Sequence, residues 1–177
     1  MRSSRPAARS TYSSLRAARA ATRLPALRKD FTIARSQIVE AAAHGADAIL
    51  LIAAILTEGE IREFREAASR YGMSALVEVH NRRELDVAVA AGAEIVGVNN
   101  RDLTTFEVTL DTSLRLAEHI PASVVRVSES GIRTGADIGR LSWAGIHAFL
   151  IGEHFMSSKD PGKALAELLR DAGEASE

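Results

Sequence analysis

The feature that most constrains this chain is a repeated pattern in which a helical stretch stops at a glycine and an apolar run follows at once. The three clearest copies are His44-Gly45-Ala46-Asp47, Ala91-Gly92-Ala93-Glu94 and Ala144-Gly145-Ile146-His147. Glycine is the usual left-handed residue that ends a helix, and a short apolar run bounded by such signals is typical of a buried strand. The chain is therefore predicted to alternate helices with strands.

This alternation predicts a parallel sheet covered by helices, because the strands are apolar almost throughout. We expect strands at residues 25–28, 48–52, 75–79, 94–98, 124–127 and 147–151. An open doubly wound sheet and a barrel both fit the pattern. Polar residues follow nearly every strand, which favours a barrel of the (β/α)8 TIM type, where all such loops meet at one mouth.

The composition fits one globular domain and excludes several kinds of site. The chain has 177 residues, of which 46% are hydrophobic and 25% charged, with a net charge of −1. No apolar run approaches the ~20 residues of a membrane span, and the near-neutral charge argues against a general nucleic-acid partner. The chain has no cysteine, which excludes thiolate catalysis, cysteine-ligated zinc and disulfides. A cytoplasmic location is expected.

The N-terminal segment is basic, since residues 1–29 contain several arginines and no acidic residue. Such a leader is typical of an organelle transit peptide or of a basic arm that binds nucleic acid. It lacks a clear apolar stripe, so we favour a frayed terminus together with one solvated basic face of a helix. We predict that residues 1–14 are disordered, with a helix from about Leu15 to Ala21, and that residues 15–177 form one partial barrel domain.

Lys29 and Glu78 are the first candidates for chemistry. Lys29 ends an apolar run, and Glu78 lies between Val77 and Val79 in a strand otherwise fit for burial. A buried carboxylate costs several kcal/mol unless it is paired. Facing each other at the mouth, the two residues could serve as a general acid and base or as a structural ion pair, and the residues alone do not separate these roles.

A phosphate site is predicted opposite this pair. Ser128-Glu129-Ser130-Gly131 and Gly152-Glu153 end the last two strands, and glycine allows a phosphate to approach the backbone closely. In Asn99-Asn100-Arg101-Asp102, the amides and the guanidinium can bind an anion, although a polar turn is the simpler interpretation of Asn100 and Asp102. The histidines show no metal spacing. We interpret His80 and His154 as bystanders and Trp143 as a packing residue.

Together, six segments resemble indole-3-glycerol-phosphate synthase in order and spacing. They are Leu27-Arg-Lys-Asp-Phe31, Gly45-Ala-Asp-Ala-Ile-Leu-Leu-Ile52, Leu76-Val-Glu-Val-His80, Gly97-Val-Asn-Asn-Arg-Asp-Leu103, Val127-Ser-Glu-Ser-Gly-Ile132 and Phe149-Leu-Ile-Gly-Glu153. The resemblance covers about residue 15 to the C-terminus. It implies a (β/α)8 barrel lyase of tryptophan biosynthesis that needs neither metal nor organic cofactor.

The resemblance also implies the substrate and the site. The small phosphorylated substrate would be 1-(2-carboxyphenylamino)-1-deoxyribulose 5-phosphate, closed to an indole ring with loss of CO2 and water. Lys29 would be the general acid and Glu78 the general base, with Asn99 and Glu129 as further catalytic residues. The substrate-binding residues would be Phe31 and Leu50 at the aromatic ring, Arg101 as a cation, and Ser130, Gly131, Gly152 and Glu153 around the phosphate.

The same resemblance predicts an incomplete barrel. Nothing in residues 1–23 matches the family's first strand, so about six of eight strands are expected, with unpaired edges at 25–28 and 148–151. Such edges favour self-association, or complementation by a fragment that supplies the missing strands. The alternative function is therefore a catalytically impaired fragment that only binds a phosphorylated ligand or self-associates.

Overall fold

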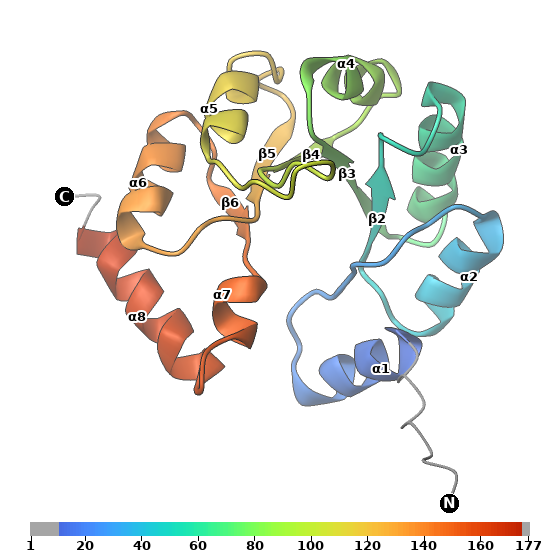
Figure 1. The fold of residues 1–177 in the computed structure, drawn as a ribbon. Helices are drawn as coiled ribbons and strands as arrows, with labels where there is room; N and C mark the ends of the chain where they lie inside the picture. The colour runs from blue at the N-terminus through green and yellow to red at the C-terminus, as the bar shows by residue number, and fades with distance from the viewer. Residues whose placement is uncertain (1–10, 175–177) are drawn as a thin grey trace, which may run out of the picture.

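The computed structural model of the protein describes residues 11–174 (Figure 1). The helices are α1 (Thr11–Ala21), α2 (Arg35–Ala43), α3 (Glu58–Ser69), α4 (Arg82–Ala90), α5 (Asp111–Ala117), α6 (Gly135–Trp143), α7 (Glu153–Met156) and α8 (Pro161–Glu174). The strands are β1 (Leu27–Arg28), β2 (Ala48–Ile52), β3 (Ser74–Val79), β4 (Ile95–Asn99), β5 (Val125–Glu129) and β6 (Ala148–Leu150). The predicted alternation is confirmed.

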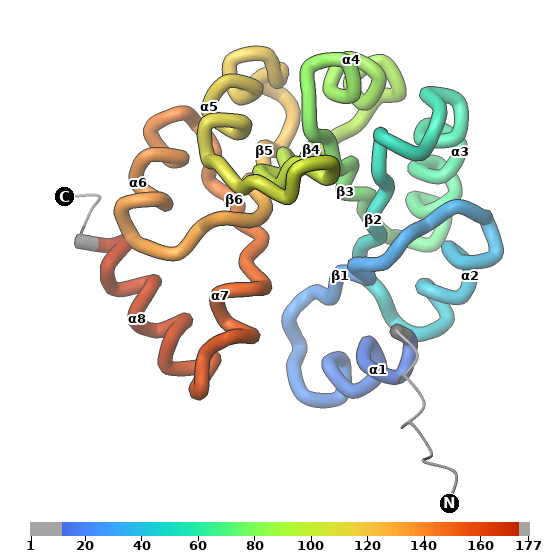
Figure 2. The backbone as a smooth tube through the Cα atoms, in the orientation of Figure 1, coloured from blue at the N-terminus to red at the C-terminus, as the bar shows by residue number. Residues whose placement is uncertain are grey.

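The six strands form one parallel sheet in the order β1-β2-β3-β4-β5-β6, so each strand pairs with its neighbours along the chain. The helices lie outside the curved sheet and form a ring around it (Figure 1). That ring is open, with β1 and α1 on one side of the opening and β6, α7 and α8 on the other (Figure 2). The predicted incomplete barrel of six strands is confirmed.

Local signals in the sequence explain where the elements begin and end. Gly45 and Gly145 follow helices with φ values of 81° and 78°, a conformation that costs little without a side chain. Thr57 and Glu60 form a capping box at the start of α3. Asn81 caps α4, its side chain accepting a hydrogen bond from the Glu84 N–H group at 3.0 Å.

Strand residues alternate between two apolar layers. Side chains on the outer face, including Ile49, Leu51 and Val77, pack under the helices in the main core. Side chains on the inner face, including Leu50, Leu76 and Val127, form a smaller cluster inside the partial barrel. Polar side chains at the ends of the same strands therefore point into the mouth when they continue the inward-facing series.

The structure differs from the sequence-based expectation at the N-terminus. Helix α1 begins at Thr11, so residues 11–14 are helical, while residues 1–10 lie outside the described part of the chain. Arg28 is 3% exposed and not part of a solvated basic face. Its guanidinium donates to Thr32 Oγ1 at 3.1 Å and lies 5.1 Å from the centre of the Tyr12 ring, which offsets the cost of burial.

The expectation that Trp143 packs against the fold is wrong, because its side chain is 95% exposed at the end of α6. Helix α6 packs against α8, and the exposed Trp143 side chain takes no part in that contact. None of the described helices has the length and apolar composition that crossing a lipid bilayer requires.

Candidate active site

The strand register places the candidate catalytic residues at one level of the inner face. Glu78 pairs with Gly97 on β4, and Asn99 pairs with Glu129 on β5. Asn99 and Glu129 are the last residues of their strands, one and two residues beyond the predicted strand ends at 98 and 127. Three polar side chains thus converge at the carboxyl ends of β3, β4 and β5.

Lys29 follows β1 and reaches across this mouth. Its ammonium Nζ lies 3.3 Å from Glu78 Oε2 and 3.1 Å from Glu129 Oε2. The expectation that Lys29 faces Glu78 is therefore confirmed. The lysine side chain is 40% exposed, whereas those of Glu78 and Glu129 are 5% and 1% exposed. One half-exposed ammonium group therefore forms ion pairs with two buried carboxylates.

Gly97 makes room for the second of these carboxylates. A Cβ atom built on Gly97 would lie 2.0 Å from Glu129 Oε1 and 3.1 Å from Leu76 Cδ1. The Glu129 carboxylate thus occupies the space that a side chain at position 97 would fill. Glycine inside an apolar strand is a signal of close approach, and our sequence analysis did not single out this residue.

The environment shifts the acidities of the three groups in different directions. Burial raises the pKa of Glu78, but the contact with His80, the hydrogen bond from Asn99 and the charge of Lys29 outweigh it and lower the pKa to about 2. Burial, followed by the charge of Glu78, raises the pKa of Glu129. Burial lowers the pKa of Lys29, but the two carboxylates outweigh burial and raise it. The pKa values of the two carboxyl groups are therefore shifted in opposite directions.

Asn99 binds the Glu78 carboxylate oxygen that Lys29 does not contact. Its amide Nδ2 donates to Glu78 Oε1 at 3.1 Å, and its Oδ1 accepts from the Arg101 N–H group at 3.1 Å. The side chain therefore fixes the orientation of the carboxylate and the backbone that leads to Arg101.

The residues expected around a phosphate line one cavity of about 210 Å³. Its lining includes Lys29, Arg101, Ser130, Gly131, Gly152 and Glu153. Ser130 and Gly131 have φ values of 66° and 79°, so two successive residues adopt the left-handed conformation. The Ser130 conformation is uncommon for a residue with a side chain, and such strain is concentrated at functional sites.

Arg101 is not free in this cavity, because its guanidinium donates to the Glu153 carboxylate in an ion pair. The pair is partly exposed, with side-chain exposures of 32% and 68%. An anion entering the cavity would compete with Glu153 for the guanidinium.

The two residues expected at the aromatic ring differ in position. Leu50 is buried in the inner apolar cluster, as the inward face of β2 predicts. Phe31 is 58% exposed and does not line the 210 Å³ cavity. Phe31 is two residues from Lys29 in the sequence.

Asn100 is a buried network residue, which corrects its interpretation as a simple turn residue. Its Nδ2 donates to Ser128 Oγ at 2.9 Å and to the Ser130 carbonyl at 3.0 Å, while its Oδ1 accepts from the Ser113 N–H group at 3.1 Å. This network ties the ends of β4 and β5 to α5 and restrains the strained Ser130. Asp102 does form the expected turn, accepting from the Thr104 and Thr105 N–H groups.

His80 was expected to be a bystander, and the structure corrects this too. Its side chain is 11% exposed and contacts both Glu78 and Glu84. The signal was present in the sequence, because residues two apart on a strand share a face. Within residues 11–174, no group of three or more histidine and acidic side chains is arranged to hold a metal.

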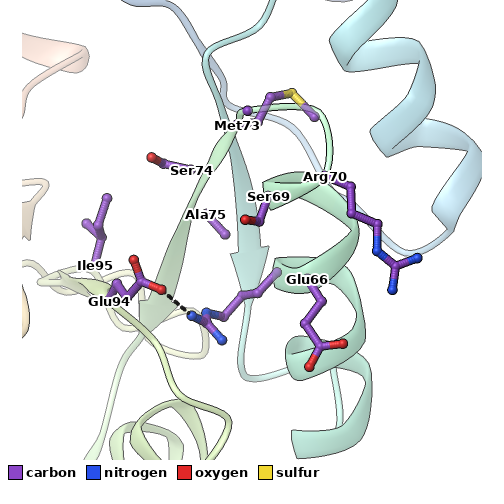
Figure 3. A pocket seen from close by; sticks show the side chains of 10 residues that line it. Glu66, Ser69, Arg70, Met73, Ser74, Ala75, Glu94 and Ile95 are labelled. Carbon is purple, nitrogen blue, oxygen red and sulfur yellow. Dashed lines mark hydrogen bonds and ion pairs between the residues drawn. The ribbon is translucent and has the colours of Figure 1, made fainter.

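A larger cavity, of about 600 Å³, lies at the opposite end of the sheet, where β3 and β4 begin (Figure 3). Glu94 and Glu66 line it together with Arg65 and Arg70. Arg65 donates to Glu94 at 2.8 Å and to the Ala91 carbonyl at 3.0 Å. Conserved chemistry in barrels of this kind is built at the other end, and none of the candidate site residues lies here.

Fold and site together define an incomplete barrel of the (β/α) type with a cluster of ion-paired side chains and a cavity at the carboxyl ends of its strands. Solved structures of low sequence identity share this fold. A mandelate oxidase mutant gives a TM-score of 0.74 at 15% identity, covering 93% of this chain and 68% of that chain. A structure described as native KDPGal gives 0.65 at 16% identity, covering 94% and 76%.

The sequence profile named indole-3-glycerol phosphate synthase matches residues 8–168, and the chain belongs to that family. The indole-3-glycerol phosphate synthase of Paracidovorax citrulli is 51% identical over 154 residues, which cover 87% of this chain and 58% of the relative. That of Chloroherpeton thalassium is 54% identical over 145 residues, covering 82% and 56%. The chain thus matches less than two thirds of the length of these relatives.

Proposed function

We propose that this chain carries the proton-transfer cluster and phosphate cavity of an indole-3-glycerol phosphate synthase. The reaction is the decarboxylating ring closure of 1-(2-carboxyphenylamino)-1-deoxyribulose 5-phosphate to indole-3-glycerol phosphate. The observation that carries the proposal is the Lys29 ammonium, which contacts both Glu78 and Glu129 and also lines the cavity formed by Ser130, Gly131 and Gly152. Family membership supports the reaction class.

In the proposed mechanism, Lys29 is the general acid. A C–C bond forms between the aromatic ring carbon that bears the carboxylate and the ketone carbon, and the Lys29 ammonium protonates the ketone oxygen. The two carboxylates raise the pKa of Lys29, which keeps it charged before the reaction. Loss of CO2 then restores the aromatic ring, because the electron pair of the broken bond returns to it.

Glu78 acts as the base in the step that follows. With a pKa of about 2 it is a weak base while Lys29 and His80 are both charged. Once Lys29 has given up its proton, one of these cations is gone and the pKa of Glu78 rises. Lys29, whose side chain is 40% exposed, takes up a second proton from solvent and passes it to the hydroxyl group, which leaves as water. The Glu78 carboxylate accepts the ring proton whose removal completes the indole. Glu129 and Asn99 hold Lys29 and Glu78 in place.

The phosphate cavity positions the reacting end. The backbone at Ser130, Gly131 and Gly152 and the cation of Arg101 surround a space of about 210 Å³. Holding the phosphate there fixes the ketone relative to Lys29, and such positioning accounts for a large part of enzymatic rate enhancement. Phe31 and Leu50 are assigned to the aromatic end of the substrate.

A second candidate function rests on the sheet edges. The outer edges of β1 and β6 pair with no other strand in the described part of the chain. An unpaired edge favours strand addition, so the chain either associates with itself or accepts the strands that complete the barrel. Alone, it would then bind phosphorylated ligand without turnover.

The test is to add the substrate to the purified chain and follow indole fluorescence, with Lys29→Ala as the matched inactive control. The assay is repeated with a polypeptide that carries the part of the Paracidovorax citrulli relative that this chain does not match. Turnover in either assay, lost in Lys29→Ala, supports the synthase proposal. Phosphate-ligand binding without turnover in both assays supports the second candidate and contradicts the first.

A further inference from the structure

A line of three charged groups extends from the mouth of the barrel to helix α4. His80 follows β3, and its imidazole lies between two carboxylates. Nδ1 lies 3.0 Å from Glu84 Oε2, and Nε2 lies 3.3 Å from Glu78 Oε1. The first contact is a hydrogen bond, whereas the second is an ion pair with poorer alignment.

Glu84, at the far end of this line, is fixed by its neighbours. Its Oε2 accepts from the His80 N–H group at 2.8 Å, and its Oε1 accepts from Asn81 Nδ2 at 2.6 Å. The Glu84 N–H group donates in turn to Asn81 Oδ1 at 3.0 Å. This carboxylate belongs to the cap of α4 and cannot turn to solvent without breaking that cap, so it anchors the imidazole.

The imidazole is a cation in this setting. Contact with Glu78, then the hydrogen bond with Glu84, raises the pKa of His80 to about 9, although burial opposes the shift. The protonated ring can donate from both nitrogen atoms. Asp102, on the loop after β4, lines the same cavity as His80. Hydrogen bonds from the Thr105 and Thr104 N–H groups lower the Asp102 pKa, and the His80 charge adds to this effect. On the other side of Glu78 lie Lys29 and Glu129.

We propose that His80 is a positioning residue that, anchored by Glu84, holds the Glu78 carboxylate from the side opposite Lys29. Glu78 is then fixed by two cations and by the Asn99 amide. When Lys29 loses its proton, the imidazolium keeps the carboxylate in place. The inference rests on the proposed function only in assigning Glu78 as the base, because the arrangement itself can be tested without substrate.

The first experiment is a pH titration of the intact chain by NMR, reading the imidazole nitrogen shifts of His80 and the carboxyl carbon shift of Glu78. The expected midpoints are about 9 for His80 and about 2 for Glu78. In Glu84→Gln the His80 midpoint moves down, by about one unit or more, since one charged partner is lost. In His80→Gln the Glu78 midpoint moves up, while His147→Gln, an exposed histidine before β6, moves neither.

A His80 midpoint near the ordinary value of about 6.5, or one that stays unchanged in Glu84→Gln, would overturn the inference. If His80→Gln fails to fold, Glu84→Gln still decides the question. Where the chain or its complemented form turns over substrate, His80→Gln shifts the acidic limb of the kcat/KM profile to higher pH. A uniform loss of activity with an unshifted acidic limb contradicts the positioning role. If no form of the chain turns over substrate, the NMR titration alone decides the inference.

Discussion

The Lys29 ammonium lies 3.1 Å from the Glu129 carboxylate, although β1 and β5 are separated by three strands of the sheet. The contact exists because the sheet curves, bringing the end of β1 opposite the end of β5. Lys29 thereby links two strands that share no backbone hydrogen bond. The ion pair is therefore a property of the curved sheet, and it is sensitive to anything that flattens or closes that curve.

The two carboxylates at Lys29 differ in their effect on stability. We expect Glu78→Gln to lower the free energy of unfolding at pH 7 by on the order of 1 to 3 kcal/mol, because the folded state favours ionised Glu78. Glu129→Gln should leave stability unchanged or raise it, because the folded state disfavours the Glu129 charge. Urea unfolding followed by circular dichroism measures both. Equal destabilisation of the two variants would contradict the opposite pKa shifts.

Stability should also fall at alkaline pH because of His80. Its pKa is about 9 in the folded chain and about 6.5 when unfolded. A raised pKa contributes stability that is fully present below about 6.5 and is lost as the pH rises through about 9. Unfolding curves between these values should show this decline in the parent chain and a flatter profile in His80→Gln. Parallel profiles would show that the histidine is uncharged.

Gly97→Ala tests the close approach of Glu129. The added Cβ atom would lie 2.0 Å from Glu129 Oε1, so the carboxylate must move by about 1 Å. The fold should persist with a loss of about 1 to 3 kcal/mol in stability, and any turnover should fall by roughly 100-fold. Gly59→Ala is the control, since its Cβ meets nothing within 4 Å. That control should gain about 0.5 kcal/mol of stability, and a similar gain in Gly97→Ala would refute the steric argument.

Asn100→Ala should be among the more costly substitutions at the site. It leaves the Ser113 N–H group and the Ser130 carbonyl without their partner in a buried setting. Each unsatisfied group costs about 1 to 3 kcal/mol, so the midpoint of urea unfolding should drop well below that of Asn81→Ala. Removing the Asn81 cap costs only ~1 kcal/mol. If the two variants unfold together, the buried network does not hold the loop.

Glu153→Gln tests the phosphate cavity directly. It removes the charge that competes for Arg101 and reduces the negative charge at the cavity. Inorganic phosphate should therefore bind several-fold more tightly, as measured by NMR shifts of Ser130 and Gly131, with about 1 kcal/mol expected for an exposed ion pair. Arg101→Gln should weaken binding and serves as the opposite control. Unchanged affinity in both variants would place the anion elsewhere.

Much of the fold followed from the sequence because its signals are local. A glycine that ends a helix, a capping pair such as Thr57 and Glu60, and an apolar run each act within a few residues. The contact between Lys29 and Glu78 was also predictable, because a carboxylate inside a buried strand needs a partner. These inferences required the local sequence signals and the order of the strands, but not the pairing register.

The remaining features depend on register and on side-chain direction. The fit of Glu129 against Gly97 requires the pairing of β4 with β5, which no local pattern specifies. The burial of Arg28 depends on Tyr12, which helix α1 places nearby. The exposure of Trp143 depends on which face of α6 meets α8. Packing between elements decides all three.

The order of the strands also bears on how the chain folds. Each strand pairs only with those next to it along the chain, so each pairing in the sheet closes no more than one βαβ unit. Parallel pairing of this kind is slow to form, because the loop must close before the strand contacts repay that cost. The contacts of Lys29 with Glu78 and Glu129 span still more of the chain, and the second needs β1 through β5 in place. We infer that the backbone scaffold assembles first and that the charged centre is completed in the last stage of folding.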